Sequence, residues 1–133
     1  MIATSPTLLI TDDDRDFRET LQNVFEPRGF RTLLAGDGRE ALEVVQSHDV
    51  HLILLDMHMP RLTGLETLRI VKQIHAPLPC ILISAGLTDG LIEQARQADA
   101  YSVLSKPVEF RELTNLVNLA LRETYDWPSL DDK

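Results

Sequence analysis

Five short apolar runs alternate with five stretches of helical periodicity along this chain, and this alternation restricts its fold more than any other feature. The runs are Thr7–Thr11, Phe30–Ala35, Leu52–Leu55, Cys80–Ile83 and Tyr101–Leu104. Strands that alternate with helices along a chain form parallel βαβ units, with the helices packed on the sheet. We therefore expect a doubly wound α/β fold in three layers, a five-stranded parallel sheet with helices on both faces.

The helical stretches are recognised by apolar residues that recur every three or four positions. We expect a first helix from Phe17 to near Pro27 and Gly29, and a fourth from Thr88 to Gln97. The inner-face residues predicted for the five helices in turn are Phe17, Leu21, Val24 and Phe25; Ala41, Leu42 and Val45; Leu65, Leu68, Val71 and Ile74; Leu91, Ile92 and Ala95; and Leu113, Leu116, Val117, Ala120 and Leu121. The last set is the clearest amphipathic pattern in the chain.

The third run, Leu52–Leu55, consists of four large aliphatic residues and is followed at once by Asp56. Such a run is typical of a strand buried on both faces, which delivers its first polar residue at the carboxyl edge of the sheet. Open α/β sheets bind their ligands at that edge. This stretch alone leaves two interpretations open, because Asp56 could equally cap a turn before Pro60.

Composition limits the classes of function. With 133 residues the chain is expected to form one domain at 1–124, followed by a polar tail at 125–133 in which Trp127 contacts the last helix or is exposed. The net charge of −8 argues against direct binding to nucleic acid or to an anionic membrane surface. No apolar run approaches the roughly 20 residues that cross a bilayer, so we expect a cytoplasmic protein. The single cysteine, Cys80, lies in an apolar run and is expected to be a buried thiol.

Polar residues stand at the ends of the predicted strands, namely Asp12, Asp13, Asp14, Asp56, Ser84 and Lys106. Carboxylates gathered in one crevice repel each other unless a cation joins them, and Mg²⁺ prefers carboxylate, water and phosphate oxygens. Lys106 offers a point charge for a phosphoryl group, and the Ser84 hydroxyl can donate a hydrogen bond to one of its oxygens. The combination is typical of phosphoryl transfer to an aspartate.

Each of these residues also has a simpler interpretation when taken alone. The acidic triplet could be a solvated helix cap, Lys106 a surface lysine and Ser84 a strand-end hydroxyl. Convergence of all of them at strand ends favours the functional interpretation. The four histidines, His48, His51, His58 and His75, match no zinc motif and are expected at the surface or in loops.

Four motifs carry a family resemblance: Leu-Leu-Ile-Thr-Asp-Asp-Asp, Leu-Leu-Asp-Met-His-Met-Pro-Arg-Leu-Thr-Gly, Ile-Leu-Ile-Ser-Ala and Leu-Ser-Lys-Pro, in this order. Together they resemble the receiver domain of two-component response regulators, from Thr7 to about Arg122. The resemblance implies the flavodoxin-like strand order 2-1-3-4-5 with five helices.

The resemblance also implies a role for each matched residue. Asp56 is the phosphoacceptor, which takes its phosphoryl group from a phosphohistidine on a sensor histidine kinase or a phosphotransfer protein. The Mg²⁺ ligands are Asp13 directly, Asp12 through water, Asp56, and the backbone carbonyl of His58. Ser84 and Lys106 contact the phosphoryl group.

Further expectations concern the loops and the output. Pro107 is expected to follow a cis peptide bond, and Gly64 to be the glycine of the loop after the third strand. The protein would be a signalling switch with only self-phosphorylation and autodephosphorylation chemistry, acting on an output domain or a target protein. A homodimer through the fourth and fifth helices stays open.

The sequence departs from the receiver pattern at two places. Val103 stands where receivers commonly carry Tyr or Phe, and Asp99-Ala100 replaces the usual Gly-Ala. If Tyr101 lies on the same face of the strand, it could partly substitute for the missing aromatic residue. One alternative is therefore a degenerate receiver that works as an interaction module without phosphorylation. A phosphatase of the haloacid-dehalogenase type is disfavoured because His58 stands where those enzymes carry a second acid.

Overall fold

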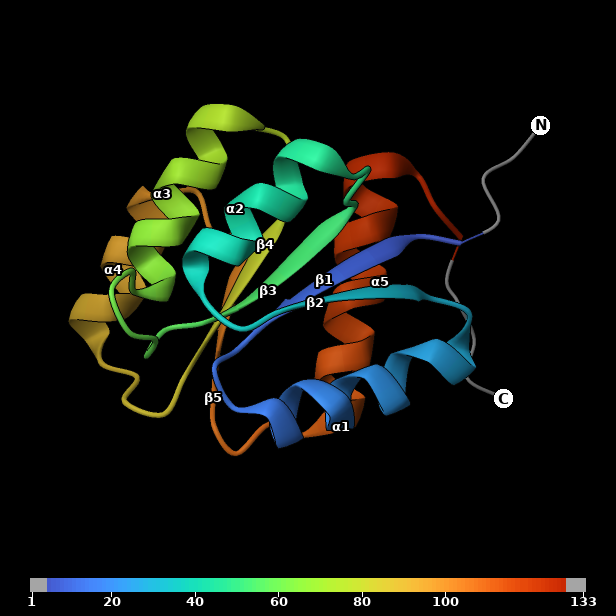
Figure 1. Cartoon of the computed structure of the whole chain (residues 1–133), viewed down its shortest axis with the longest axis horizontal. Helices are drawn as coiled ribbons and strands as arrows, with labels where there is room; N and C mark the ends of the chain where they lie inside the picture. The colour runs from blue at the N-terminus through green and yellow to red at the C-terminus, as the bar shows by residue number, and fades with distance from the viewer. Residues whose placement is uncertain (1–4, 129–133) are drawn as a thin grey trace.

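The computed structural model describes residues 5–128 and shows the predicted alternation of strands and helices (Figure 1). The elements in chain order are β1 Thr7–Thr11, α1 Arg15–Phe25, a 3₁₀ turn Glu26–Arg28, β2 Arg31–Ala35, α2 Gly38–Ser47, β3 Leu52–Asp56, α3 Gly64–Ile74, β4 Cys80–Ser84, α4 Asp89–Gln97, β5 Ser102–Ser105 and α5 Phe110–Tyr125. Residues 1–4 and 129–133, which include most of the predicted tail, lie outside the described part of the chain.

All five strands form one parallel sheet in the order β2-β1-β3-β4-β5, as the family resemblance implied. The inner strands β1, β3 and β4 are buried at every position, which explains why they appear in the sequence as unbroken apolar runs. The edge strands β2 and β5 are less buried. The chain order reverses between β1 and β3, so the crevice of the fold opens at the carboxyl ends of these two strands.

Two apolar clusters cover the two faces of the sheet. Alternate residues of β3 divide between them: Ile53 belongs to the cluster under α2, α3 and α4, while Leu54 belongs to the cluster under α1 and α5. Figure 1 shows this arrangement as three layers, with the sheet between the two groups of helices. Cys80 is a buried free thiol, and burial raises its pKa to about 12.

Side chains cap the helices where the sequence supplies an acceptor. The Asp14 carboxylate accepts the N–H groups of Asp16 and Phe17 at the start of α1, which confirms its interpretation as a cap. Thr63 and Glu66 form a reciprocal capping box at α3. None of the helices between residues 5 and 128 has the length and apolar character needed to cross a membrane.

The prediction that every inner-face residue packs against the core was wrong at two positions. Ile74 and Ile92 were expected to pack inward, but their exposed fractions are 43% and 40%. Ile74 is the last residue of α3, where no further turn continues the buried stripe. Ile92 directly follows Leu91, and neighbouring residues on a helix point about 100° apart, so only Leu91 reaches the core.

Trp127 contacts the last helix, which was one of the two alternatives expected from the sequence. Tyr125 is still part of α5, and Trp127 is half-buried beside it, with ring centroids 6.1 Å apart. The Trp127 ring also packs edge-on against His51, 4.8 Å away, a contact that the sequence did not predict. His51 Nδ1 in turn accepts the backbone N–H of Thr7 at 2.9 Å. Through His51, the residue after α5 thus contacts the region where β1 and β3 begin.

Candidate functional site

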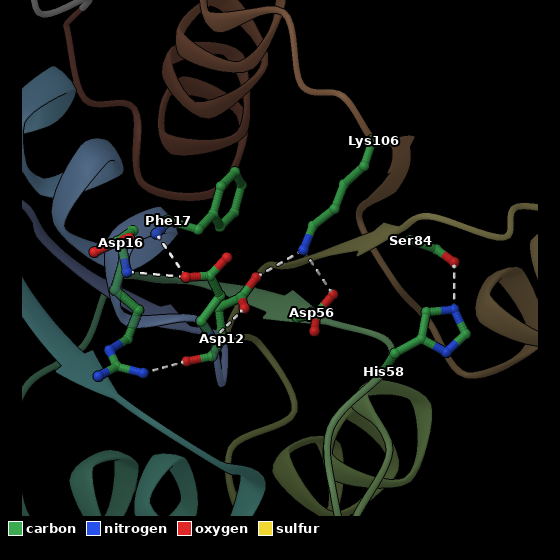
Figure 2. Close-up of polar contacts among 9 residues, drawn as sticks. Asp12, Asp16, Phe17, Asp56, His58, Ser84 and Lys106 are labelled. Carbon is green, nitrogen blue, oxygen red and sulfur yellow. Dashed lines mark hydrogen bonds and ion pairs between the residues drawn. The ribbon is translucent and has the colours of Figure 1, made fainter.

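The residues predicted at strand ends meet at the carboxyl edge of the sheet (Figure 2). Asp12 directly follows β1, Asp56 and Ser84 are the last residues of β3 and β4, and Lys106 directly follows β5. Register brings them together, because Asp56 pairs with Ile83 and Ser84 pairs with Ser105. Four strands thus contribute one polar group each to a single crevice.

Three carboxylates form the acidic part of the crevice. One oxygen from each of Asp12, Asp13 and Asp56 lies within 4.8 Å of the other two, and residues 5–128 contain no second group of three potential metal ligands. Asp12 and Asp56 are 1% and 4% exposed, whereas Asp13 is exposed. Three negative charges against one lysine leave an excess that a divalent cation with oxygen ligands would neutralise. The donor set therefore fits a hard cation such as Mg²⁺.

Lys106 bridges the two buried carboxylates. Its Nζ lies 3.0 Å from Asp12 Oδ2 and 3.2 Å from Asp56 Oδ1 (Figure 2). Its backbone N–H donates to the carbonyl of Ser84 at 2.9 Å, which fixes the loop that carries it. Burial lowers the pKa of Lys106, but the hydrogen bonds and charges of Asp12 and Asp56 outweigh burial and raise it. The ammonium group is therefore charged at neutral pH and directed at Asp56.

Asp56 itself is held in an unfavourable environment for its charge. Burial raises the pKa of its carboxyl group, and the negative charge of Asp12 raises it further, while Lys106 lowers it. The net direction is upward from the ordinary value of 3.8. Ionised Asp56 is thus less favourable in the folded protein than in the unfolded chain when no cation is bound.

We expect this charge to reduce stability as the pH rises. Between the ordinary pKa of 3.8 and the raised folded value, the folded state holds the proton of Asp56 more tightly than the unfolded chain. The free energy of unfolding therefore contains a contribution that is lost as the pH rises through this window. Urea unfolding of metal-free protein from about pH 4 to about pH 7 measures it. Asp56→Asn should remove this contribution, and equal pH dependence in both proteins would contradict the assignment.

Ser84 is fully buried and its hydroxyl has two contacts. The Ser84 Oγ accepts the backbone N–H of Gly86 at 3.0 Å and lies 3.3 Å from His58 Nε2 (Figure 2). The family resemblance implied only the backbone carbonyl of His58 as part of the site. Its imidazole contact with Ser84 was missed, because it depends on how the loop after β3 approaches the end of β4.

Phe17 is a second residue that the sequence did not assign to the site. It was predicted only as part of the inner face of the first helix. Its ring faces the ammonium of Lys106, with Nζ 4.5 Å from the ring centroid. Phe17 also packs at the edge of the cluster under α1 and α5, where it is half-buried.

Two loop features implied by the resemblance are present. The peptide bond between Lys106 and Pro107 is cis. Gly64 begins α3 directly against β3, and a Cβ atom placed on it would lie 2.3 Å from the backbone oxygen of Asp56. Glycine is therefore required at this position by the close approach of the two backbones.

Tyr101 does not lie on the same face of the sheet as Val103, as a substitute for the missing aromatic residue would have to do. Val103 packs against the cluster under α2, α3 and α4, whereas Tyr101 packs against the opposite cluster. Tyr101 precedes β5, so strand alternation does not apply to it. Its hydroxyl donates to Glu123 of α5. The expectation that the two residues share a face was therefore wrong.

Comparison with known sequences agrees with this geometry. Residues 8–118 match the pattern of the response regulator receiver domain. Response regulator MprA of Mycolicibacterium vanbaalenii is 36% identical over 119 residues, which cover 88% of this chain and 51% of that protein. Transcriptional regulatory protein CpxR of Escherichia coli is 33% identical over 120 residues, covering 89% and 50%. The chain spans about half the length of these relatives.

Solved structures share the fold over nearly their whole length. The receiver domain of Francisella response regulator 1452 superposes with a TM-score of 0.85 at 29% identity, covering 90% of this chain and 99% of that one. A CheY-like receiver domain protein from Methanospirillum hungatei has a TM-score of 0.88 at 22% identity, covering 92% and 98%, which bears on the fold alone. With its matching sequence pattern, fold and strand-end residues, this chain belongs to the family of response regulator receiver domains of two-component systems.

Proposed function

We propose that this receiver accepts a phosphoryl group on Asp56 in a Mg²⁺-dependent reaction and thereby changes a surface that a partner recognises. The observation that carries the proposal is the position of Asp56, which is buried at a strand end and paired with Lys106 at 3.2 Å. A rigid carboxylate beside a fixed cation suits a transfer in which the protein mainly positions groups and neutralises charge.

In the proposed transfer, a carboxylate oxygen of Asp56 attacks the phosphorus atom of the donor. The new P–O bond forms as the bond from phosphorus to the donor breaks, and the electron pair of that bond leaves with the donor group. Lys106 balances negative charge on the phosphoryl oxygens, and the Ser84 hydroxyl donates a hydrogen bond to one of them. Lys106 already lies beside Asp56, and Ser84 ends β4, the strand next to β3.

The metal would be held by Asp12, Asp13 and Asp56, with the backbone carbonyl of His58 as a further ligand proposed from the family resemblance. When bound, Mg²⁺ supplies charge neutralisation for the phosphoryl oxygens. Both oxygens of Asp12 already have partners, because Oδ2 bonds to Lys106 and Oδ1 accepts the N–H of Asp14, and this suits a contact with the metal through water.

Asp13→Asn should weaken Mg²⁺ binding at least about tenfold, because loss of groups that merely support metal ligands already costs that much. Calorimetric titration of the metal gives the affinity directly. Asp14→Asn is the matched control, since it makes the same charge change one residue away and keeps an acceptor for the cap of α1. Equal affinities in the two variants would remove Asp13 from the ligand set.

The proposed function is tested by incubating the protein with Mg²⁺ and acetyl phosphate and measuring the intact mass. The expected product carries one phosphoryl group, and chelation of the metal should prevent its formation. A chain that acquires no phosphoryl group would instead support the alternative of an interaction module independent of phosphorylation. The reason to test this alternative is that Val103 stands where receivers commonly carry an aromatic residue.

The physiological donor would be a sensor histidine kinase or a phosphotransfer protein. The phosphorylated receiver would act on an output domain or a separate target protein, with a homodimer as one route. We further propose a cytoplasmic location, chemistry confined to its own phosphorylation and dephosphorylation, and a domain boundary near residue 124. The relatives MprA, a response regulator, and CpxR, a transcriptional regulatory protein, support an output in signalling, although this chain corresponds to about half of either protein.

A further inference from the structure

We propose that Phe17 is a positioning residue for phosphorylation, because its aromatic ring holds the ammonium group of Lys106 beside Asp56. This inference rests on the proposed function for its effect on rate, but the contact itself can be tested without phosphorylation. Among the described residues, three groups contact Lys106 Nζ: the carboxylates of Asp12 and Asp56, and the ring of Phe17.

The ring contact differs in kind from the two carboxylate contacts. Both carboxylates belong to the acidic cluster that fits a divalent cation, so a bound cation competes with Lys106 for their oxygens. The face of an aromatic ring attracts an ammonium group but offers no oxygen to Mg²⁺. Of the three contacts to the ammonium, the one with Phe17 is therefore the one for which a bound cation does not compete.

Local structure fixes the ring in this position. Asp14 caps α1 and accepts the N–H of Phe17 at 3.4 Å, so the residue lies in the first helical turn. Its side chain packs at the edge of the cluster that includes α5, the helix that follows the loop of Lys106. Figure 2 shows the Phe17 ring near the Lys106 side chain.

Burial argues against a role for Phe17 in the core alone. Phe25, two turns further along α1, is fully buried and packs edge-on against Phe30 with centroids 5.0 Å apart. Phe17 is only half-buried, and the Lys106 side chain that it contacts is 26% exposed. Without the ring, this long side chain is free to turn toward solvent once a cation occupies the carboxylates.

The contact is tested first by NMR of the metal-free protein. A methylene group above a ring is shifted upfield by the ring current, so the ε-protons of Lys106 should resonate upfield of those of ordinary lysines. Phe17→Leu should abolish the shift, while Phe17→Tyr and Phe17→Trp should retain it. An ordinary shift in the unmodified protein would overturn the inference, whatever the outcome of phosphorylation.

The effect on function is tested with acetyl phosphate and saturating Mg²⁺. Phe17→Leu should slow phosphoryl incorporation about fivefold, whereas the two aromatic variants should stay within about twofold of the unmodified rate. Val24→Ala, which trims another half-buried residue at the edge of the same cluster on α1, should leave the rate unchanged. In a Lys106→Met background, Phe17→Leu should have no further effect, because the ammonium is already gone.

The outcomes separate the two proposals. If the unmodified protein gains no phosphoryl group, the proposed function fails, and the NMR shift still decides whether the ring holds the lysine. If the unmodified protein is phosphorylated and Phe17→Leu reacts equally fast, the positioning role is overturned while the proposed function stands. Slow phosphoryl incorporation by Phe17→Tyr and Phe17→Trp would also overturn the positioning role. So would a Phe17→Leu substitution that slows the Lys106→Met protein as much as the unmodified one. Either result would show that Phe17 acts through packing.

Discussion

Asp56→Asn should abolish phosphoryl incorporation completely while leaving the protein folded. The amide keeps the shape of the carboxylate but lacks the nucleophilic oxygen pair, so no acyl phosphate can form. Folding should not suffer, because burial and Asp12 already disfavour the charge of Asp56 when no cation is bound. Metal-free Asp56→Asn should therefore unfold at a higher urea concentration than the unmodified protein near neutral pH.

Intact mass spectrometry after incubation with acetyl phosphate and Mg²⁺ gives the first result, and circular dichroism verifies the fold. Asp14→Asn again serves as a control with the same chemical change, since Asp14 only caps α1. It should incorporate the phosphoryl group as the unmodified protein does. Labelling that survives in Asp56→Asn would place the acceptor on another residue.

Gly64→Ala should cost about 3 kcal/mol of unfolding free energy, the upper end of the range for overpacking. Its Cβ would lie 2.3 Å from the backbone oxygen of Asp56 and 2.8 Å from the Leu82 side chain, and backbone atoms cannot move aside cheaply. Relief of this overlap would displace Asp56 itself. Loss of phosphorylation rate should therefore accompany the loss of stability.

Gly90→Ala is the control for this substitution, because the only neighbour of its Cβ within 4 Å is Thr88 Oγ1, at 3.9 Å. Alanine at this exposed position in α4 should stabilise the protein by about 0.5–1 kcal/mol through helix propensity. Urea unfolding measures both variants. A Gly64→Ala protein as stable as the unmodified one would contradict the close approach of α3 to β3.

The fold and the polar groups of the crevice could be predicted from sequence because both depend on regular geometry. Parallel strands end at one edge, so the residues that follow them converge there whatever the details of packing. Asp12, Asp56, Ser84 and Lys106 were placed correctly for this reason. The strand order came from the family resemblance, since periodicity does not specify which strands are neighbours.

Contacts across irregular segments could not be predicted in this way. The imidazole of His58 reaches Ser84 at the end of β4 from the loop after β3, and Trp127 packs on His51 across 76 positions of sequence. Tyr101 was misplaced because the strand that would have fixed its direction begins one residue later. Each case depends on loop conformation, for which residue spacing gives no rule.

Phe17 illustrates a related difficulty. Its helical spacing predicted an inner-face residue, and Phe17 does pack at the edge of the apolar cluster. The spacing did not predict that its ring also contacts Lys106. The cation beside it comes from Lys106, 89 positions away, and no local pattern links the two. A residue at the rim of a core can therefore carry a site contact that periodicity assigns to packing.

The central claim is that Asp56 is the phosphoacceptor, and chemical mapping of the modified residue tests it most directly. Borohydride reduces an aspartyl phosphate to homoserine, which peptide sequencing by mass spectrometry locates. After incubation with acetyl phosphate and Mg²⁺, we predict homoserine at position 56 and at no other aspartate. Homoserine at Asp12 or Asp13, or a phosphoryl group that resists reduction, would contradict the account.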